Sequence, residues 1–320
     1  MNASVALPRG GTTTPLGIGL ATLMREPSRR RQQQLLRAAY EAGYRHFDVA
    51  PSYGLGAAER VLGEFLRSRP AGVTVGTKVG IRVRSNAGLV RTLERPARAI
   101  LRQFPGLRGR ATRAVGGAVH VPPDFAIASC ERSLAESRRA LGLERLDLLL
   151  LHEATAADLA DGKAVEWIQE QRRRGLVRAI GVATSALAAR EIFAAHPGVF
   201  DVVQTPSSVL APAVEGVSGL VPLTVTHSVI ALPLARATAR LANDPAWGSR
   251  LSEVAGIDAM APGAIARLLV AWALSENRQG VVLLGSSSEG HIRSAAAVIS
   301  ALDPQRAQAV ATFLRETLHD

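Results

Sequence analysis

Residues 45–54 read RHFDVAPSYG, residues 73–80 read VTVGTKVG, and residues 146–153 read LDLLLLHE. In each stretch a short apolar run of strand type gives way to polar residues. Four side chains suited to acid–base chemistry stand at or just beyond the ends of these runs. They are Asp48, Tyr53, Lys78 and His152. Because β/α barrels keep their chemistry at the carboxyl ends of their strands, this placement predicts a barrel whose active site these four residues form.

The rest of the chain alternates between strand-like and helix-like segments, which is typical of parallel strands joined by helical crossovers. The expected strands are residues 16–20, 45–49, 73–78, 146–151, 177–182, 200–204, 221–226 and 281–284. The expected helices are residues 29–42, 57–69, 124–141, 162–174, 187–195, 262–275, 289–300 and 304–318.

These elements predict an α/β fold, a (β/α)8 TIM barrel with long loops after strands three and seven and two C-terminal helices. We expect one domain over residues 1–320, with an arginine-rich insertion at about 80–122. A doubly wound sheet is the alternative, but no G-x-G-x-x-G motif follows the first expected strand.

Three helix boundaries carry a local signal. Asp124 is expected as an N-cap, Gly142 as the end of the same helix, and Asp303 followed by Pro304 as the start of the last helix. The one cysteine, Cys130, excludes an internal disulfide and is expected as a buried small hydrophobe, as in a reducing cytoplasm.

The net charge of +11 is concentrated in one segment. Residues 82–113 contain nine arginines and a single acid, so the overall basicity does not indicate a nucleic-acid-binding protein. The segment also has one aromatic residue, Phe104, whereas single-strand binders interleave aromatic and basic groups. We expect a cytoplasmic protein without a signal peptide or a membrane span. We expect it to bind a small carbonyl or alcohol substrate, and the arginine-rich segment leaves open that this substrate is anionic.

Lys78 and Lys163 are the only lysines among 38 basic residues. An ammonium is a compact charge that can sit beside a phenol, whereas arginine is a planar fork that never releases its proton. Beside Tyr53 it would lower the pKa of the phenol, a carboxylate would keep it charged, and a histidine would orient a carbonyl. The four residues therefore suit proton donation to a carbonyl oxygen that receives hydride.

The chain resembles the aldo-keto reductase family in several long motifs that occur in order. They are AGYRHFDVAPSYGLGAAERVLGEFL (42–66), SCERSLAESRRALGLERLDLLLLHE (129–153), GLVRAIGVATS (175–185), FDVVQTPSS (200–208) and GSSSEGHIRSAAAVI (285–299). The resemblance implies an NAD(P)-dependent oxidoreductase acting on an aldehyde, ketone or sugar-type alcohol, with Tyr53 as proton donor or acceptor. It also implies that the coenzyme lies extended across the barrel mouth and that no metal is needed.

The same resemblance implies a set of coenzyme-binding residues. They are Thr184, Gln204, His227, Ser228, Gly285, Ser286, Ser287 and His291. Three parts of the chain depart from the family pattern: Ala183-Thr184 replace a Ser-Asn pair, His227 replaces a stacking aromatic residue, and Ser286, Ser287, Ser288 and His291 stand where the family usually has basic residues. NADP(H) and NAD(H) therefore both remain open, and Arg293 or an arginine of the long loop could restore a preference for NADP.

Two hypotheses from other classes remain. The departures at Ala183, Thr184 and His227 suit a catalytically weak, cofactor-binding regulatory protein on the same barrel. The arginines of residues 82–113 suit a barrel that docks an anionic partner.

Overall fold

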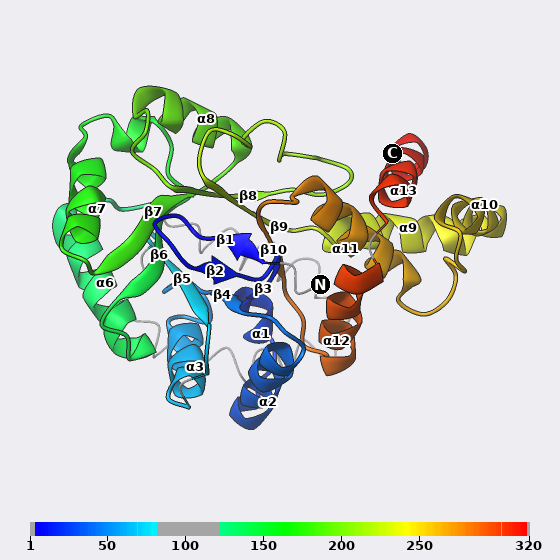
Figure 1. Ribbon diagram of the computed structural model, residues 1–320, viewed down its shortest axis with the longest axis horizontal. Helices are drawn as coiled ribbons and strands as arrows, with labels where there is room; N and C mark the ends of the chain where they lie inside the picture. Colours follow the sequence, from blue (N-terminus) through cyan, green and yellow to red (C-terminus); the bar gives the residue numbers. More distant parts are fainter. Residues whose placement is uncertain (1–3, 69, 82–121, 302, 319–320) are drawn as a thin grey trace, which may run out of the picture.

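The protein is described by a computed structural model that covers residues 4–68, 70–81, 122–301 and 303–318. Eight parallel strands form a closed barrel, and β10 completes the ring by pairing with both β9 and β3 (Figure 1). In chain order the strands are β3 (Leu16–Gly19), β4 (His46–Asp48), β5 (Thr74–Val79), β6 (Leu146–His152), β7 (Val177–Ala183), β8 (Val202–Pro206), β9 (Leu223–His227) and β10 (Val281–Leu284). The predicted (β/α)8 barrel is confirmed, and each strand lies within two residues of its expected bounds.

Helices surround the barrel, with the short α1 (Leu20–Leu23) at its mouth (Figure 1). The others in chain order are α2 (Arg29–Glu41), α3 (Ala57–Leu66), α6 (Ile127–Leu141), α7 (Lys163–Arg173), α8 (Ala186–Ala195), α9 (Ala231–Asn243), α10 (Pro245–Ala255), α11 (Ala264–Glu276), α12 (Glu289–Ala297) and α13 (Pro304–Thr317). Short 3₁₀ turns lie at Ala157–Leu159 and Val298–Ala301. The amphipathic pattern explains the arrangement, as in α2, where Leu35, Leu36 and Ala39 face the core.

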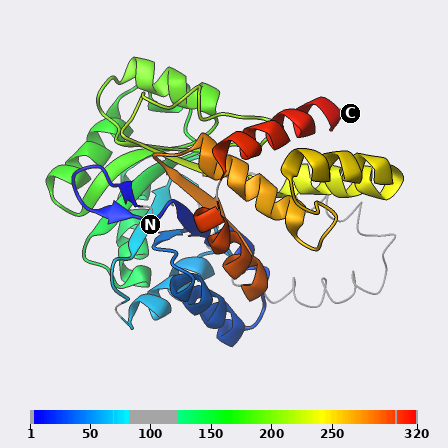
Figure 2. The same cartoon turned by 45° about the vertical axis from the view of Figure 1, so that its right-hand side comes forward.

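The segment after strand seven is helical in α9 and α10, so the prediction of a long loop there is wrong. Asp244 N-caps α10 by accepting a hydrogen bond from the Trp247 amide, with Pro245 at the first helical position. Trp247 is fully buried and packs on Phe313 of α13, so tertiary contact holds the pair of helices against the C-terminus. Figure 2 shows α9, α10 and α13 gathered on one side of the barrel. The long loop predicted after strand three falls largely outside the described residues.

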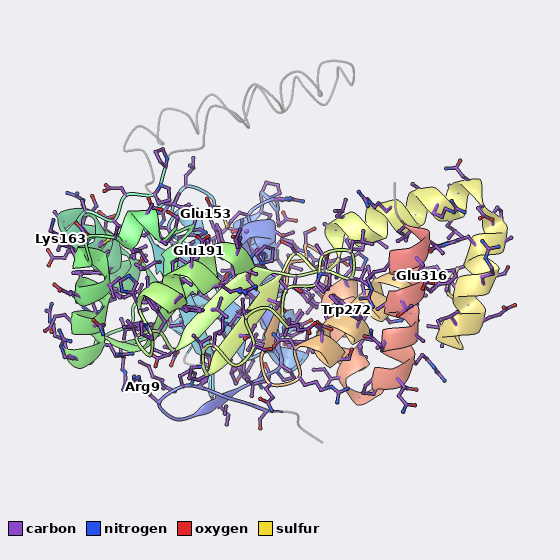
Figure 3. All side chains as sticks on the ribbon, turned by 90° about the horizontal axis from the view of Figure 1, so that it is seen from above. Arg9, Glu153, Lys163, Glu191, Trp272 and Glu316 are labelled. Atoms are coloured by element: carbon purple, nitrogen blue, oxygen red, sulfur yellow. The ribbon has the colours of Figure 1, made fainter. Side chains whose placement is uncertain are left out.

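A two-stranded hairpin of β1 (Val5–Ala6) and β2 (Thr12–Thr13), absent from the prediction, closes the amino end of the barrel. Val5 and Leu7 pack among the side chains that fill the barrel interior. Arg9 at the tip of the hairpin pairs with Asp201, at 3.1 Å. Figure 3 shows Arg9 and Glu153 at opposite ends of the barrel, so the hairpin lies away from the catalytic mouth.

Two of the three predicted helix boundaries are confirmed. Gly142 ends α6 in the left-handed conformation, and Asp303 caps α13. The N-cap predicted at Asp124 is wrong, because α6 begins at Ile127. Asp124 instead accepts hydrogen bonds from the amide of Ala126 and the hydroxyl of Ser129 just before and within the first turn. Cys130 is buried as expected.

Candidate active site

Neighbouring strands bring the four predicted site residues together at the carboxyl end of the barrel. Asp48 ends β4, Lys78 is the last residue but one of β5, and His152 ends β6. Tyr53 reaches the same place from the turn that follows β4. All four line one cleft, which continues past the barrel mouth to residues of α9, α11 and α12. The four side chains therefore lie where the local sequence predicts them, at the carboxyl ends of the strands or just beyond.

A buried ion pair forms the base of the site. The Lys78 ammonium donates to both carboxylate oxygens of Asp48 at 2.7 Å and to the Val49 carbonyl at 3.1 Å. Lys78 is 1% exposed and Asp48 3%. Burial by itself lowers the pKa of Lys78, but the charges of Asp48 and Tyr53 and their hydrogen bonds outweigh it, so its pKa is raised. Lys78 is therefore held as a cation.

Tyr53 lies against this cation and beside His152. The Lys78 nitrogen is 5.1 Å from the centroid of the phenol ring, and the rings of Tyr53 and His152 meet edge to face at 6.2 Å. Burial raises the pKa of Tyr53, and Lys78 lowers it by a smaller amount, so the net shift is upward. The predicted lowering by the ammonium is present, but desolvation outweighs it in the protein alone. Tyr53 is therefore a protonated phenol at neutral pH.

His152 is the second group that could carry a proton. Burial and then the positive charge of Lys78 lower its pKa to about 3. The imidazole is neutral at pH 7 and can offer an N–H to an oxygen, but it is not a useful acid there. Of these two groups, Tyr53 is the one that carries a proton to donate at neutral pH.

Gln204 of β8 connects the ion pair with the expected coenzyme side of the cleft. Its amide nitrogen donates to Asp48 at 3.4 Å, and its buried amide oxygen has no hydrogen-bond partner. An unpaired buried acceptor costs free energy until a donor reaches it. The carboxamide NH2 of a nicotinamide is such a donor, so Gln204 fits the expected coenzyme.

Thr184, His227 and Ser228 line the same cleft. Thr184 is fixed by its amide, which donates to the Gln204 carbonyl at 3.0 Å, and His227 Nδ1 lies 2.9 Å from the Ser228 hydroxyl. Burial lowers the pKa of His227, so this ring is an uncharged surface against which a planar group can stack.

The predicted phosphate segment leads into α12. Gly285, Ser286 and His291 line the cleft, whereas Ser287 does not. Ser288 caps α12 by accepting a hydrogen bond from the His291 amide, and the lining residues Ser286 and His291 place the start of this helix at the cleft. A Cβ at Gly285 would lie 2.5 Å from the Thr22 hydroxyl oxygen, so only glycine lets this segment pass α1 so closely.

Arg293, the arginine that could restore a preference for NADP, is paired with a carboxylate. Arg293 donates to Glu41 at 2.9 Å, and Arg31 pairs with Glu289 at the first turn of α12 at 2.7 Å. Both arginines are thus partly neutralised. The long-loop arginines named as the other source lie outside the described residues.

Sequence reasoning missed the parts of the cleft that carry no local motif. Thr22 comes from α1 and Arg25 from the turn after it, and α9 and α11 contribute Leu234, Thr238 and Arg267. It also missed Glu153, which follows His152 directly. The residues of α1, α9 and α11 reach the cleft through the packing of elements distant in sequence, so no local pattern could indicate them, whereas the position of Glu153 beside His152 was a signal that the sequence did offer.

Candidate metal sites and membrane-spanning helices are both absent from the described segments. No group of three or more His, Cys, Asp or Glu side chains there could hold a metal ion. Within those same segments, no helix combines the length and the apolar character needed to cross a membrane.

A family model described as Aldo/keto reductase family matches residues 15–216. This match covers well over half of the chain and contains all four strand-end residues. The chain belongs to the aldo/keto reductase family. The predicted family is thus confirmed.

Two curated relatives of this family resemble the chain. It is 33% identical over 235 residues to a D-threo-aldose 1-dehydrogenase from Pseudomonas sp, across 67% of this chain and 66% of that protein. It is 34% identical over 166 residues to a pyridoxal 4-dehydrogenase from Microbacterium luteolum, across 51% of this chain and 46% of that protein. The chain therefore aligns with just under two thirds of the first relative and about half of the second.

Solved aldo-keto reductases share the fold across their whole length. The glycerol dehydrogenase AKR11B4 from Gluconobacter oxydans is 18% identical with a TM-score of 0.71, covering 100% of this chain and 97% of that one. An aldo/keto reductase from Klebsiella pneumoniae, solved in complex with NADP and acetate, is 19% identical with a TM-score of 0.69, covering 98% and 96%. At these identities the likeness is one of fold.

Proposed function

We propose that the protein is an NAD(P)-dependent oxidoreductase that moves a hydride between nicotinamide and the carbonyl or alcohol carbon of a small sugar-type substrate. One observation carries the proposal: the contact chain from Asp48 through Lys78 to Tyr53, with His152 beside the phenol, at the mouth of an aldo/keto reductase barrel. A buried ion pair of this kind is costly to maintain in a protein that does not use it.

Each residue has a distinct role in the proposed reaction. The bound nicotinamide supplies or accepts the hydride. The Tyr53 hydroxyl gives its proton to the substrate oxygen during reduction and takes it back during oxidation. Lys78 stabilises the phenolate that reduction leaves behind, and Asp48 holds Lys78 in place. The neutral His152 donates its N–H to the substrate oxygen and orients it.

We propose that the coenzyme lies in the cleft that extends from these residues to α12. Gln204 would accept from the nicotinamide carboxamide, His227 would stack on the ring, and Thr184 and Ser228 would flank it. Gly285, Ser286 and His291 would receive the phosphates at the start of α12. The pairing of Arg31 and Arg293 with carboxylates supports NAD(H) over NADP(H), because neither guanidinium is free to clamp a 2′-phosphate.

The names of the two curated relatives support a dehydrogenase that acts on a polar aldehyde or its hemiacetal. An aldose and pyridoxal each carry an aldehyde with a hydroxyl group positioned to close on it as a cyclic hemiacetal. Oxidation of that hemiacetal carbon gives a lactone, and Tyr53 would then act as the proton acceptor. We propose lactol oxidation of this kind as the physiological direction.

The test compares the two lysines of the chain. We expect Lys78→Met to lose at least about a hundredfold in kcat for NAD(P)-linked oxidation of a panel of aldoses and pyridoxal. Lys163→Met is the matched control, because Lys163 is exposed, pairs only with Asp161 and lies outside the cleft. Equal turnover of both variants would contradict the proposal.

The alternative of a catalytically weak, cofactor-binding regulatory or docking protein rests on the altered Ala183-Thr184 pair. A fluorescence titration with NADH and NADPH separates it from the enzyme. Binding of a coenzyme with no turnover of any aldose, aldehyde or ketone by the wild type would favour the alternative.

A further inference from the structure

Backbone strain in the described chain is concentrated at the mouth of the barrel. Four residues other than glycine have a positive φ, and one of them, Arg9, lies at the hairpin tip. The other three follow proposed site residues: Leu55 comes two positions after Tyr53, Glu153 directly after His152, and Ser228 directly after His227. A positive φ is uncommon for a residue such as glutamate, and residues in this conformation cluster at functional sites.

The backbone of Glu153 is fixed by a hydrogen bond, whereas its carboxylate has no partner among the described residues. Its amide donates to the Ala183 carbonyl at 2.7 Å, which continues the ladder between β6 and β7 and fixes the backbone beside His152. The side chain is exposed and lines the cleft, and among the described residues it makes no hydrogen bond or ion pair. Figure 3 shows Glu153 at the end of the barrel opposite Arg9, at the carboxyl ends of the strands.

The negative charge of Glu153 acts electrostatically on Tyr53. It adds to the upward shift of the pKa of Tyr53, although burial is the largest cause. Besides the ion pair of Asp48 and Lys78, the other charged residues that line the cleft come from other segments: Arg25 after α1, Asp124 before α6, Arg132 and Glu136 on α6, and Arg267 on α11. Glu153 is the one joined directly to a residue of the proposed catalytic set.

We propose that Glu153 is a specificity-determining residue whose carboxylate selects hydroxylated, uncharged substrates and rejects anionic ones. A carboxylate only accepts hydrogen bonds, so it binds substrates whose hydroxyl groups donate to it. A second anion brought close to this carboxylate in the same cleft is repelled. The inference rests on the proposed function and narrows its substrate class to uncharged, hydroxylated molecules. The arginine-rich segment had instead left an anionic substrate open.

The experiment compares two aldehydes of nearly equal shape, 4-formylbenzamide and 4-carboxybenzaldehyde, in NAD(P)H-dependent reduction. We expect the wild type to favour the uncharged amide by about tenfold or more in kcat/KM. Glu153→Gln keeps the shape and removes the charge, so the ratio should fall to within about threefold. Glu153→Gly suits the positive φ and should give the same fall, which separates the charge from the backbone.

Glu191→Gln is the matched control. Glu191 is an exposed carboxylate on α8 that does not line the cleft, so its loss should leave the wild-type ratio unchanged. A ratio in Glu153→Gln equal to that of the wild type overturns the inference and leaves the proposed function standing. No turnover of the aldoses, of pyridoxal or of either aromatic aldehyde by the wild type with either coenzyme overturns the proposed function, and the inference with it.

Discussion

Replacing Tyr53 with phenylalanine removes one oxygen from the centre of the proposed site and leaves the ring. The edge-to-face contact with His152 and the position of the ring over Lys78 are both made by the ring. We therefore expect the variant to fold and to bind coenzyme as the wild type does. Only the proton that the hydroxyl carries is lost.

The size of the effect follows from the two groups that could replace that proton. Lys78 is bonded to both oxygens of Asp48 and its pKa is raised, so it does not release a proton at pH 7. The pKa of His152 is lowered to about 3, so roughly one imidazole in 10⁴ is protonated at pH 7. Since general acid catalysis contributes about 10²–10⁴-fold, we expect kcat to fall by about 10³-fold.

The assay is steady-state turnover followed at the nicotinamide absorbance, together with coenzyme titration by protein fluorescence. Tyr40→Phe is the matched control, because its hydroxyl donates only to the Ala71 carbonyl and lies outside the cleft. In the reductive direction the residual rate of Tyr53→Phe should rise as the pH falls from 7 towards 5, as His152 gains its proton. A kcat within threefold of the wild type would refute the assignment of the proton to Tyr53.

Two further predictions concern stability. His46 is fully buried with Nδ1 unpaired among the described residues, and burial lowers its pKa from 6.5 to about 4. The neutral ring therefore contributes to the free energy of unfolding above pH 6.5, and this contribution is lost as the pH falls towards 4. In urea unfolding, His46→Gln should reduce the fall in the free energy of unfolding between pH 7 and pH 4 by about 3 kcal/mol. Asp201 accepts hydrogen bonds from Arg9, Arg172 and the Ile180 amide, so Asp201→Asn should lower the free energy of unfolding by about 2 kcal/mol at pH 7, and an unchanged urea midpoint would show that the barrel does not depend on this junction.

The sequence was sufficient for the strands and for the four strand-end residues because both depend on local pattern. An almost unbroken apolar run such as residues 146–151 is typical of a strand buried on both faces, and the end of that strand then defines where His152 lies. The N-terminal hairpin could not be predicted, because its strands have two residues each and show no period. The helix start at Asp244-Pro245 repeats the signal at Asp303-Pro304, so α10 was within reach of the sequence.

The electrostatics of the site could not be predicted from the sequence, because they depend on burial. Lys78 favours the phenolate of Tyr53, as its residue type indicates, yet desolvation by the surrounding barrel reverses the net direction. The unpaired oxygen of Gln204 and the free carboxylate of Glu153 are likewise products of tertiary packing. Residue types thus identified the participants, while the three-dimensional packing decided their protonation.

The choice of lysine at position 78, in a chain that otherwise prefers arginine, follows from this packing. One nitrogen serves both oxygens of Asp48 and the Val49 carbonyl within 3.1 Å, and it still lies against the ring of Tyr53. A guanidinium spreads its charge over a plane and directs its donors outward in a fixed fork, so it could pair with the carboxylate only by turning away from the phenol. The barrel buries this nitrogen almost completely, and Asp48 offsets the cost of doing so. The ion pair therefore keeps one compact positive charge in a fixed place beside Tyr53, the proposed proton donor.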